Sequence, residues 1–152
     1  MIPTIRVFIA DDHAIVRKGF CQIIEEVPDM QVVGEATNGD EVLEQSLKAD
    51  WDVLVLDLSM PGRTGLDVIQ ALRNHKPELP ILVLSMHPED QYAIRLLKNG
   101  IAGYMNKEAA LDSLVSAIRK VVAGGKYVSE ALAEKLAFDL SVCGREQSAL
   151  AF

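Results

Sequence analysis

Hydrophobic residues are grouped along the chain in two alternating patterns. Short runs rich in Val, Ile and Leu predict five strands, at Ile5–Ala10, Gln31–Thr37, Asp52–Asp57, Pro80–Ser85 and Ile101–Met105. Apolar residues at helical spacing between and after them predict five helices, at about 13–26, 39–48, 65–75, 88–98 and 109–123. This alternation is typical of βαβ units, and we expect an α/β fold with a doubly wound parallel sheet.

The composition of the strands indicates which of them are central. The runs VFIA, VLVLD and ILVLS are apolar almost throughout, as burial on both faces of a sheet requires, whereas QVVGEAT is mixed and suits an edge. Turn residues mark the element boundaries at Asn38-Gly39, Pro61-Gly62 and Asn99-Gly100. Beyond Gly124-Gly125, a further helix is predicted from Ser129 to Leu140, with Ser129 as its N-cap.

Composition narrows the class of protein. A chain of 152 residues that is 49% hydrophobic suits one compact domain with a short appendage. The net charge of -7 and the absence of a basic run disfavour direct binding to DNA. The first residues do not resemble a signal peptide, and no apolar run approaches the roughly 20 residues of a membrane span, so we expect a soluble, cytoplasmic protein without membrane contact. Neither cysteine has metal-ligand spacing.

Candidate chemistry lies where the predicted strands end. Asp11 and Asp12 follow the first strand, Asp57 ends the third, and Ser85 and Lys107 come at the ends of the fourth and fifth. Right-handed crossovers bring the carboxyl ends of parallel strands to one edge, where ligands bind. Carboxylates about 4 Å apart repel by roughly 4 kcal/mol per pair, so a divalent cation is needed, and oxygen ligands suit Mg²⁺. A carboxylate beside such a metal can attack phosphorus and form an aspartyl phosphate.

Four segments together resemble the receiver domain of two-component response regulators. They are IADD at the first strand end, VLVLDLSMPGRTG at the third, ILVLS at the fourth and GYMNKEA at the fifth, and the resemblance covers residues 5–124. It implies a flavodoxin-like sheet with strand order 2-1-3-4-5. It also implies that Asp57 is the phosphoacceptor, that Asp11 and Asp12 bind Mg²⁺, and that the main-chain carbonyl of Ser59 is a further metal ligand.

The resemblance also implies a switch. Ser85 and Lys107 would bind the phosphoryl oxygens, and the ring of Tyr104 would rotate when those bonds form. Two residues depart from the common receiver pattern. Glu108 follows Lys107 where many receivers have proline, and a cis peptide bond before a residue other than proline costs about 2.5 to 4 kcal/mol. The hydroxyl residue is Ser85, whereas threonine is commoner.

Simpler interpretations accompany these roles. Asp11 and Asp12 are also suited to capping the first helix, and Tyr104 to packing. His13 lies beside the acidic pair and His87 lies two residues past Ser85, so both are candidates to face the site, but no spacing groups the histidines as metal ligands. A stripe at four-residue intervals in the last helix favours packing within the chain over a partner surface; it consists of Leu132, Leu136 and Leu140.

Three further segments resemble the NarL/FixJ (LuxR-type) subfamily: GRTGLDVI, LSMH and AGGKYVSEALAEKL. Its members continue into a helix-turn-helix DNA-binding domain. We therefore expect a receiver at 1–124 and a linker helix with a tail at 125–152, cut from a longer regulator. The expected partners are a sensor histidine kinase and, after phosphorylation, a second copy of this chain in a homodimer. DNA is expected to bind only through the missing helix-turn-helix domain.

The favoured function is that of a signalling phosphoacceptor domain rather than an enzyme. It would catalyse its own phosphorylation, and the aspartyl phosphate would then be hydrolysed slowly. Three alternatives remain open. The first is a free-standing receiver or relay protein. The second is a phosphohydrolase of the haloacid dehalogenase type, but that chemistry wants an acid two residues after the nucleophile, where this chain has Ser59. The third is a flavodoxin-like binder, which leaves the grouping of acids and lysine unexplained.

Overall fold

The computed structural model describes residues 4–86, 91–130 and 132–138. The strands are β1 (Ile5–Ala10), β2 (Met30–Ala36), β3 (Val53–Asp57), β4 (Ile81–Ser85) and β5 (Gly103–Asn106). The helices are α1 (Ala14–Glu25), α2 (Gly39–Ser46), α3 (Gly65–His75), α4 (Gln91–Lys98) and α5 (Ala110–Val122). Every strand and helix expected in residues 5–123 is present, with ends within a few residues of the prediction. Residues 88–90 of the predicted fourth helix lie outside the described residues.

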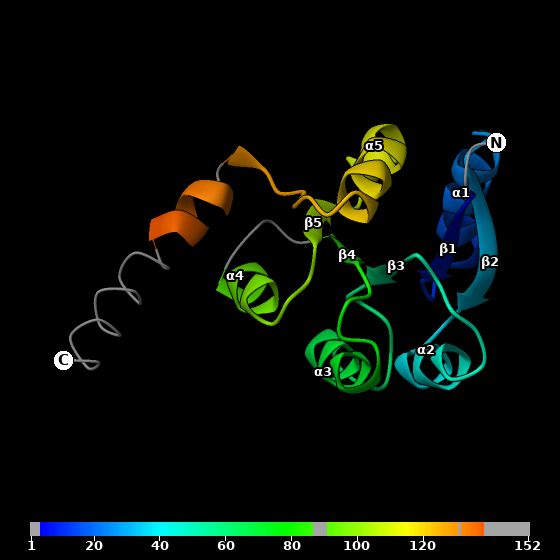
Figure 1. Cartoon of the computed structure of the whole chain (residues 1–152), viewed down its shortest axis with the longest axis horizontal. Helices are drawn as coiled ribbons and strands as arrows, with labels where there is room; N and C mark the ends of the chain where they lie inside the picture. Colours follow the sequence, from blue (N-terminus) through cyan, green and yellow to red (C-terminus); the bar gives the residue numbers. More distant parts are fainter. Residues whose placement is uncertain (1–3, 87–90, 131, 139–152) are drawn as a thin grey trace.

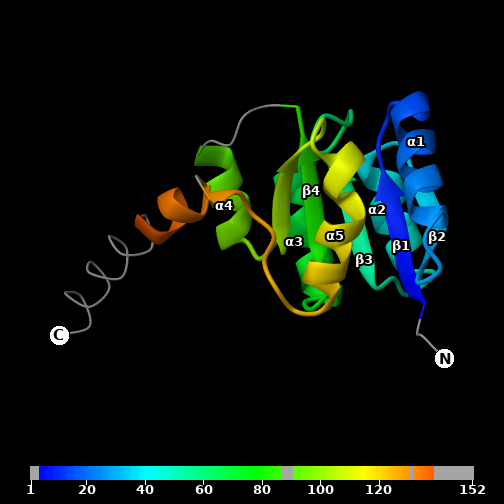
Figure 2. The same cartoon turned by 90° about the horizontal axis from the view of Figure 1, so that it is seen from above.

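All five strands are parallel and form one sheet in the order β2-β1-β3-β4-β5. The predicted flavodoxin-like order is therefore confirmed. α1 and α5 cover one face of the sheet, and α2, α3 and α4 cover the other (Figures 1 and 2). Strand order reverses beside β1, so β1 and β3 lie side by side at the point where ligands bind in open α/β sheets.

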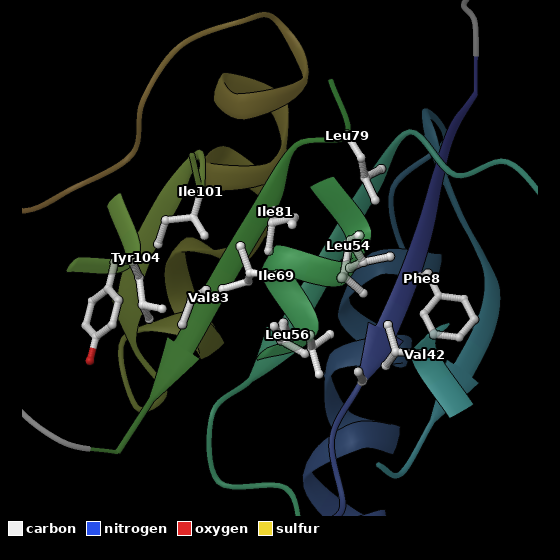
Figure 3. Packing of buried hydrophobic residues seen from close by; sticks show 14 of the residues in the cluster. Phe8, Val42, Leu54, Leu56, Ile69, Leu79, Ile81, Val83, Ile101 and Tyr104 are labelled. Carbon is white, nitrogen blue, oxygen red and sulfur yellow. The ribbon is translucent and has the colours of Figure 1, made fainter. Parts of the chain in front are cut away.

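Alternate residues of the central strands enter two separate hydrophobic layers. Val7 and Ile9 of β1 pack with the residues of α1 and α5, whereas Phe8 packs on the opposite face with α2 and α3. Figure 3 shows the second layer, which runs from Phe8 on β1 to Tyr104 on β5. Because β3 and β4 are buried on both faces, a polar side chain at the end of either strand lies next to the core.

Local side-chain bonds set where two of the helices begin. The Asn38 side chain accepts a hydrogen bond from the Glu41 amide at 2.9 Å, and Thr64 Oγ accepts one from the Asp67 amide at 3.1 Å. Gly62 has a φ of 89°, a conformation that glycine adopts without steric cost. These bonds turn the chain sharply after β2 and β3, so the segment after β3 stays at the carboxyl edge of the sheet.

The segment after α5 is attached to the edge strand β5. Tyr127 forms an isolated parallel bridge with Gly103. The Tyr104 amide donates to the Tyr127 carbonyl at 2.9 Å, and the Tyr127 amide donates to the Ala102 carbonyl at 3.0 Å. A Cβ atom on Gly103 would lie 2.9 Å from the Tyr127 carbonyl oxygen, so glycine permits this close approach. The linker therefore extends the sheet beyond its fifth strand.

A C-terminal helix follows and includes residues 132–138. Ser129 Oγ accepts a hydrogen bond from the Leu132 amide at 3.1 Å, which confirms the predicted N-cap. Leu132 is fully buried in the same layer as Ile94 of α4 and Tyr104, and Leu136 packs against this layer. Packing within the chain is therefore confirmed for these two leucines, whereas Leu140 lies outside the described residues. Among the helices that are described, none is long and apolar enough to cross a bilayer.

Replacing Leu132 with Ala should lower the free energy of unfolding by about 2 kcal/mol or more, because a buried leucine loses its contacts and leaves a cavity. Urea denaturation followed by the fluorescence of Trp51, the one tryptophan of the chain, measures this change. The matched control is Phe138→Ala in the same helix, because Phe138 is 74% exposed and should contribute little. Equal effects of the two substitutions would contradict docking of this helix through Leu132.

Candidate functional site

Two acids meet at the carboxyl edge of the sheet. Asp57 is the last residue of β3, and Asp11 directly follows β1. Ala10 pairs with Leu56 across the two strands, so the acids lie on adjacent strand ends. Each is only 1% exposed. Burial of two carboxylates is costly without a cation and hydrogen bonds, so their partners determine whether this edge is stable.

Lys107 supplies the cation. Its Nζ atom lies 2.9 Å from Asp11 Oδ2 and 3.1 Å from Asp57 Oδ2, and the residue is 5% exposed. The Lys107 amide donates to the Ser85 carbonyl at 2.8 Å, which fixes the start of the side chain beside β4. Burial acts to lower the pKa of Lys107, but Asp11 and Asp57 outweigh burial and raise it above its usual value. The ammonium therefore stays charged.

The second oxygen of Asp57 is held by the loop that follows β3. The Ser59 amide donates to Asp57 Oδ1 at 3.1 Å, and Ser59 Oγ donates to the same atom at 2.9 Å. Burial acts to raise the pKa of Asp57, but the bonds from Ser59 and Lys107 outweigh it and lower the pKa below its usual value. Asp57 therefore stays ionised, and its contribution to stability is present at neutral pH and lost as the pH falls through its lowered pKa.

Asp12 and His13 complete the cluster. Asp12 is partly exposed, and its Oδ1 atom lies 3.1 Å from His13 Nδ1. The His13 amide donates to Asp11 Oδ1 at 2.8 Å and so orients that carboxylate. The N-cap position of α1 is His13, and no side chain makes a cap hydrogen bond there, so Asp12 does not cap this helix. The sequence placed His13 beside the acidic pair as a candidate to face the site, and its ring does lie next to Asp11 and Asp12.

The structure brings together most of the residues predicted for the site. Asp11, Asp12, Asp57 and Lys107 converge, and Ser59 binds Asp57 directly. Ser85 ends β4 and is 2% exposed, with its carbonyl bonded to Lys107. The peptide bond between Lys107 and Glu108 is trans, since the described residues contain no cis peptide bond.

Tyr104 lies within β5, 2% exposed, in the layer that also contains Leu132. This position is consistent with packing within the chain.

Known proteins that are similar to this chain identify its family. The family described as "Response regulator receiver domain" matches residues 7–119. The chain belongs to the response regulator receiver family. Response regulator GacA from Pseudomonas aeruginosa is 38% identical over 133 residues, which cover 88% of this chain and 62% of GacA. Oxygen regulatory protein NreC from Staphylococcus carnosus is 38% identical over 86% of this chain and 61% of its own length.

Solved receiver structures share the fold. A LuxR-family response regulator from a species of Aurantimonas superposes with a TM-score of 0.82 and 31% identity, over 91% of this chain and 99% of that chain. The non-phosphorylated receiver domain of RcsB from Escherichia coli gives a TM-score of 0.78 and 33% identity, over 84% of this chain and 99% of that chain. These relatives confirm the predicted NarL/FixJ-type subfamily. This receiver spans about three fifths of the length of the curated relatives that it matches.

The acidic cluster of this receiver fits a divalent cation. Ligand atoms of Asp11, Asp12, His13 and Asp57 all lie within 4.8 Å of one another. In the described part of the chain, Asp11 Oδ2 and Asp12 Oδ1 are buried without a hydrogen-bond partner, although Lys107 neutralises the former by charge. Three carboxylates against one ammonium leave a formal excess of two negative charges. The arrangement therefore matches a cation of charge two.

Replacing Lys107 with Met should lower the free energy of unfolding by about 3 kcal/mol at pH 7, because buried carboxylates lose their partner while the apolar side chain is kept. The loss should shrink as the pH falls, since the pKa of Asp57 rises without the ammonium and protonation relieves the repulsion. Urea denaturation at neutral and mildly acidic pH measures both effects. Lys48→Met, at an exposed ion pair with Glu44, is the control and should change stability little. A loss independent of pH would contradict this account.

Proposed function

We propose that this chain is the phosphoacceptor part of a transcriptional response regulator and that Asp57 carries the phosphoryl group. One observation carries the proposal: Asp57 is a buried, ionised carboxylate held at Oδ1 by Ser59 and at Oδ2 by Lys107, beside Asp11 and Asp12. Membership of the receiver family supports it. The names of its relatives, response regulator and oxygen regulatory protein, support a regulatory role for the whole protein.

Mg²⁺ is the proposed cofactor. Asp11, Asp12, Asp57 and the main-chain carbonyl of Ser59 would hold it, since hard oxygen ligands suit this cation. When bound, Mg²⁺ supplies positive charge that offsets the crowded carboxylates and the phosphoryl oxygens. Support for the site comes from two buried carboxylate oxygens: Asp12 Oδ1, which has no hydrogen-bond partner, and Asp11 Oδ2, which contacts the Lys107 ammonium.

The proposed donor is the phosphohistidine of a sensor kinase. An oxygen of Asp57 attacks phosphorus, a P–O bond forms, the P–N bond of the donor breaks, and the imidazole leaves as a neutral ring after taking up a proton. Ser59 keeps Asp57 oriented for attack, and Lys107 offsets the charge of the transferred group. Water later cleaves the same P–O bond slowly. The phosphoryl group is therefore a signal of limited lifetime rather than a product.

Phosphorylation would change the bonds at this edge. The new phosphoryl oxygens are strong acceptors, and the Ser85 hydroxyl and the Lys107 ammonium are donors on the adjacent strand ends. Movement of Ser85 would open space on the side of β5, and Tyr104 would rotate into it. The Tyr104 amide is bonded to Tyr127, and its ring shares a layer with Leu132, so a change at Tyr104 would reach the linker directly.

Binding of DNA is proposed only for a separate domain of the whole regulator. The negative charge of this chain supports that division, because a net charge of -7 repels phosphates. Another solved structure similar to this chain contains two RcsB dimers bound to two parallel DNAs, which supports a homodimer as the active form. Cytoplasmic location follows from such a role. A free-standing receiver or relay protein would use the same chemistry at Asp57.

Incubation with Mg²⁺ and a small phosphodonor such as acetyl phosphate should add one phosphoryl group, detected as a mass gain that is stable to acid and labile to base. Asp57→Asn should abolish the gain, because the amide lacks the nucleophilic oxygen. Asp67→Asn, an exposed acid in the first turn of α3, is the matched control and should retain it. Turnover of many equivalents of donor would favour the haloacid dehalogenase-type alternative, and a gain that survives in Asp57→Asn would contradict the proposal.

Ser85→Ala should permit phosphorylation but weaken the switch. Loss of one hydrogen bond to a charged acceptor costs about 1.5 to 3 kcal/mol, which changes the ratio of switched to unswitched protein by roughly 10- to 100-fold. Ring resonances of Tyr104 in NMR spectra of the phosphorylated protein measure this ratio. Ser85→Thr keeps the hydroxyl and is the control. Full switching in phosphorylated Ser85→Ala would show that Ser85 does not transmit the signal.

A further inference from the structure

We propose that His13 gives the metal site a nitrogen ligand, so that the site binds first-row transition cations such as Ni²⁺ or Zn²⁺ more tightly than oxygen ligands alone would. The inference rests on the proposed function only in that it concerns the same metal site. A cation held in this way competes with Mg²⁺ for Asp11, Asp12 and Asp57.

The His13 ring lies beside the carboxylates of the proposed metal site. His13 occupies the N-cap position of α1, but its side chain makes no cap hydrogen bond. Its Nδ1 atom lies 3.1 Å from Asp12 Oδ1 and 3.4 Å from Asp11 Oδ1. The side chain is 58% exposed, so nothing forces the ring inward by burial. The ring nonetheless lies beside the acids, where its nitrogen and the carboxylates can reach one ion.

The contacts of the Lys107 ammonium show that a positive charge is stabilised at this place. Its ammonium lies 2.9 Å from Asp11 Oδ2, 3.1 Å from Asp57 Oδ2 and 3.5 Å from His13 Nδ1. Whether Nδ1 accepts from this ammonium or donates to Asp12 Oδ1 depends on the tautomer of the ring, and in the tautomer with its proton on Nε2 the Nδ1 atom offers a lone pair. That lone pair is the one a metal needs. Two carboxylate oxygens and one imidazole nitrogen therefore already surround a positive charge.

The type of ligand atom decides which metal ions bind more tightly because of His13. Imidazole nitrogen suits Zn, Cu, Fe and Ni, whereas Mg²⁺ prefers oxygen ligands and keeps several waters. Ligand atoms of the four residues lie within 4.8 Å of one another, and donors on opposite sides of an ion with bonds of about 2.1 Å are about 4.2 Å apart. A small closure brings all four onto one ion. The nitrogen therefore adds affinity for transition cations and little for Mg²⁺.

The test compares the affinities of untagged protein for Ni²⁺ and Mg²⁺ by titration calorimetry. In His13→Ala, the ratio of Ni²⁺ affinity to Mg²⁺ affinity should fall at least about tenfold, because even outer-shell partners of a metal site contribute that much. His75→Ala is the matched control. His75 is an exposed histidine bonded to Ser46 at the far end of α3, and its loss should leave the ratio unchanged.

A second readout identifies the ligand directly. Ni²⁺ is paramagnetic, and substoichiometric Ni²⁺ should broaden the ring resonances of His13 in NMR spectra while those of His75 stay sharp. Equal losses of Ni²⁺ and Mg²⁺ affinity in His13→Ala would overturn the inference and leave His13 as an orienting residue for Asp11. If phosphorylation of Asp57 with Mg²⁺ persists in that case, the proposed function stands without the inference. A wild-type protein that binds neither cation would overturn both.

Discussion

The balance of charge at one edge of the sheet is the constraint on which the rest depends. Asp11 and Asp57 are buried on adjacent strand ends, and Lys107 reaches both from the other side of β4. Removal of Lys107 would leave two carboxylates uncompensated in a poorly solvated place. In the proposed function, an arriving phosphoryl group or metal ion would therefore change the energies of several loops together.

The same geometry connects the edge to the surface. The Lys107 amide is hydrogen-bonded to the Ser85 carbonyl. Tyr104, three residues earlier in the chain, is hydrogen-bonded through its amide to the Tyr127 carbonyl of the linker. Leu132 then places the C-terminal helix in the layer that contains Tyr104 and Ile94. A short path of hydrogen bonds and packed side chains thus joins the acidic cluster to the C-terminal helix.

Much of this arrangement could be predicted from the chain itself. The apolar runs predicted the strands, because burial on both faces leaves little room for polar residues, and the handedness of crossovers placed Asp11, Asp57 and Lys107 at one edge. The position of His13 beside the acidic pair also indicated that it could face the site, but not which atoms it contacts. The pairing of Tyr127 with Gly103 escaped prediction, because it depends on backbone contacts that leave no hydrophobic period.

What the sequence determined by itself was therefore the order of elements, the family and the set of charged residues, because these follow from local periodicity and from the chemistry of short segments. Tertiary structure alone decided which oxygen of Asp57 bonds to Ser59 and which to Lys107, which atoms of the acids His13 contacts, and that the linker pairs with β5. Such choices depend on distances between groups far apart in the chain, and these distances exist only after packing has fixed every neighbour.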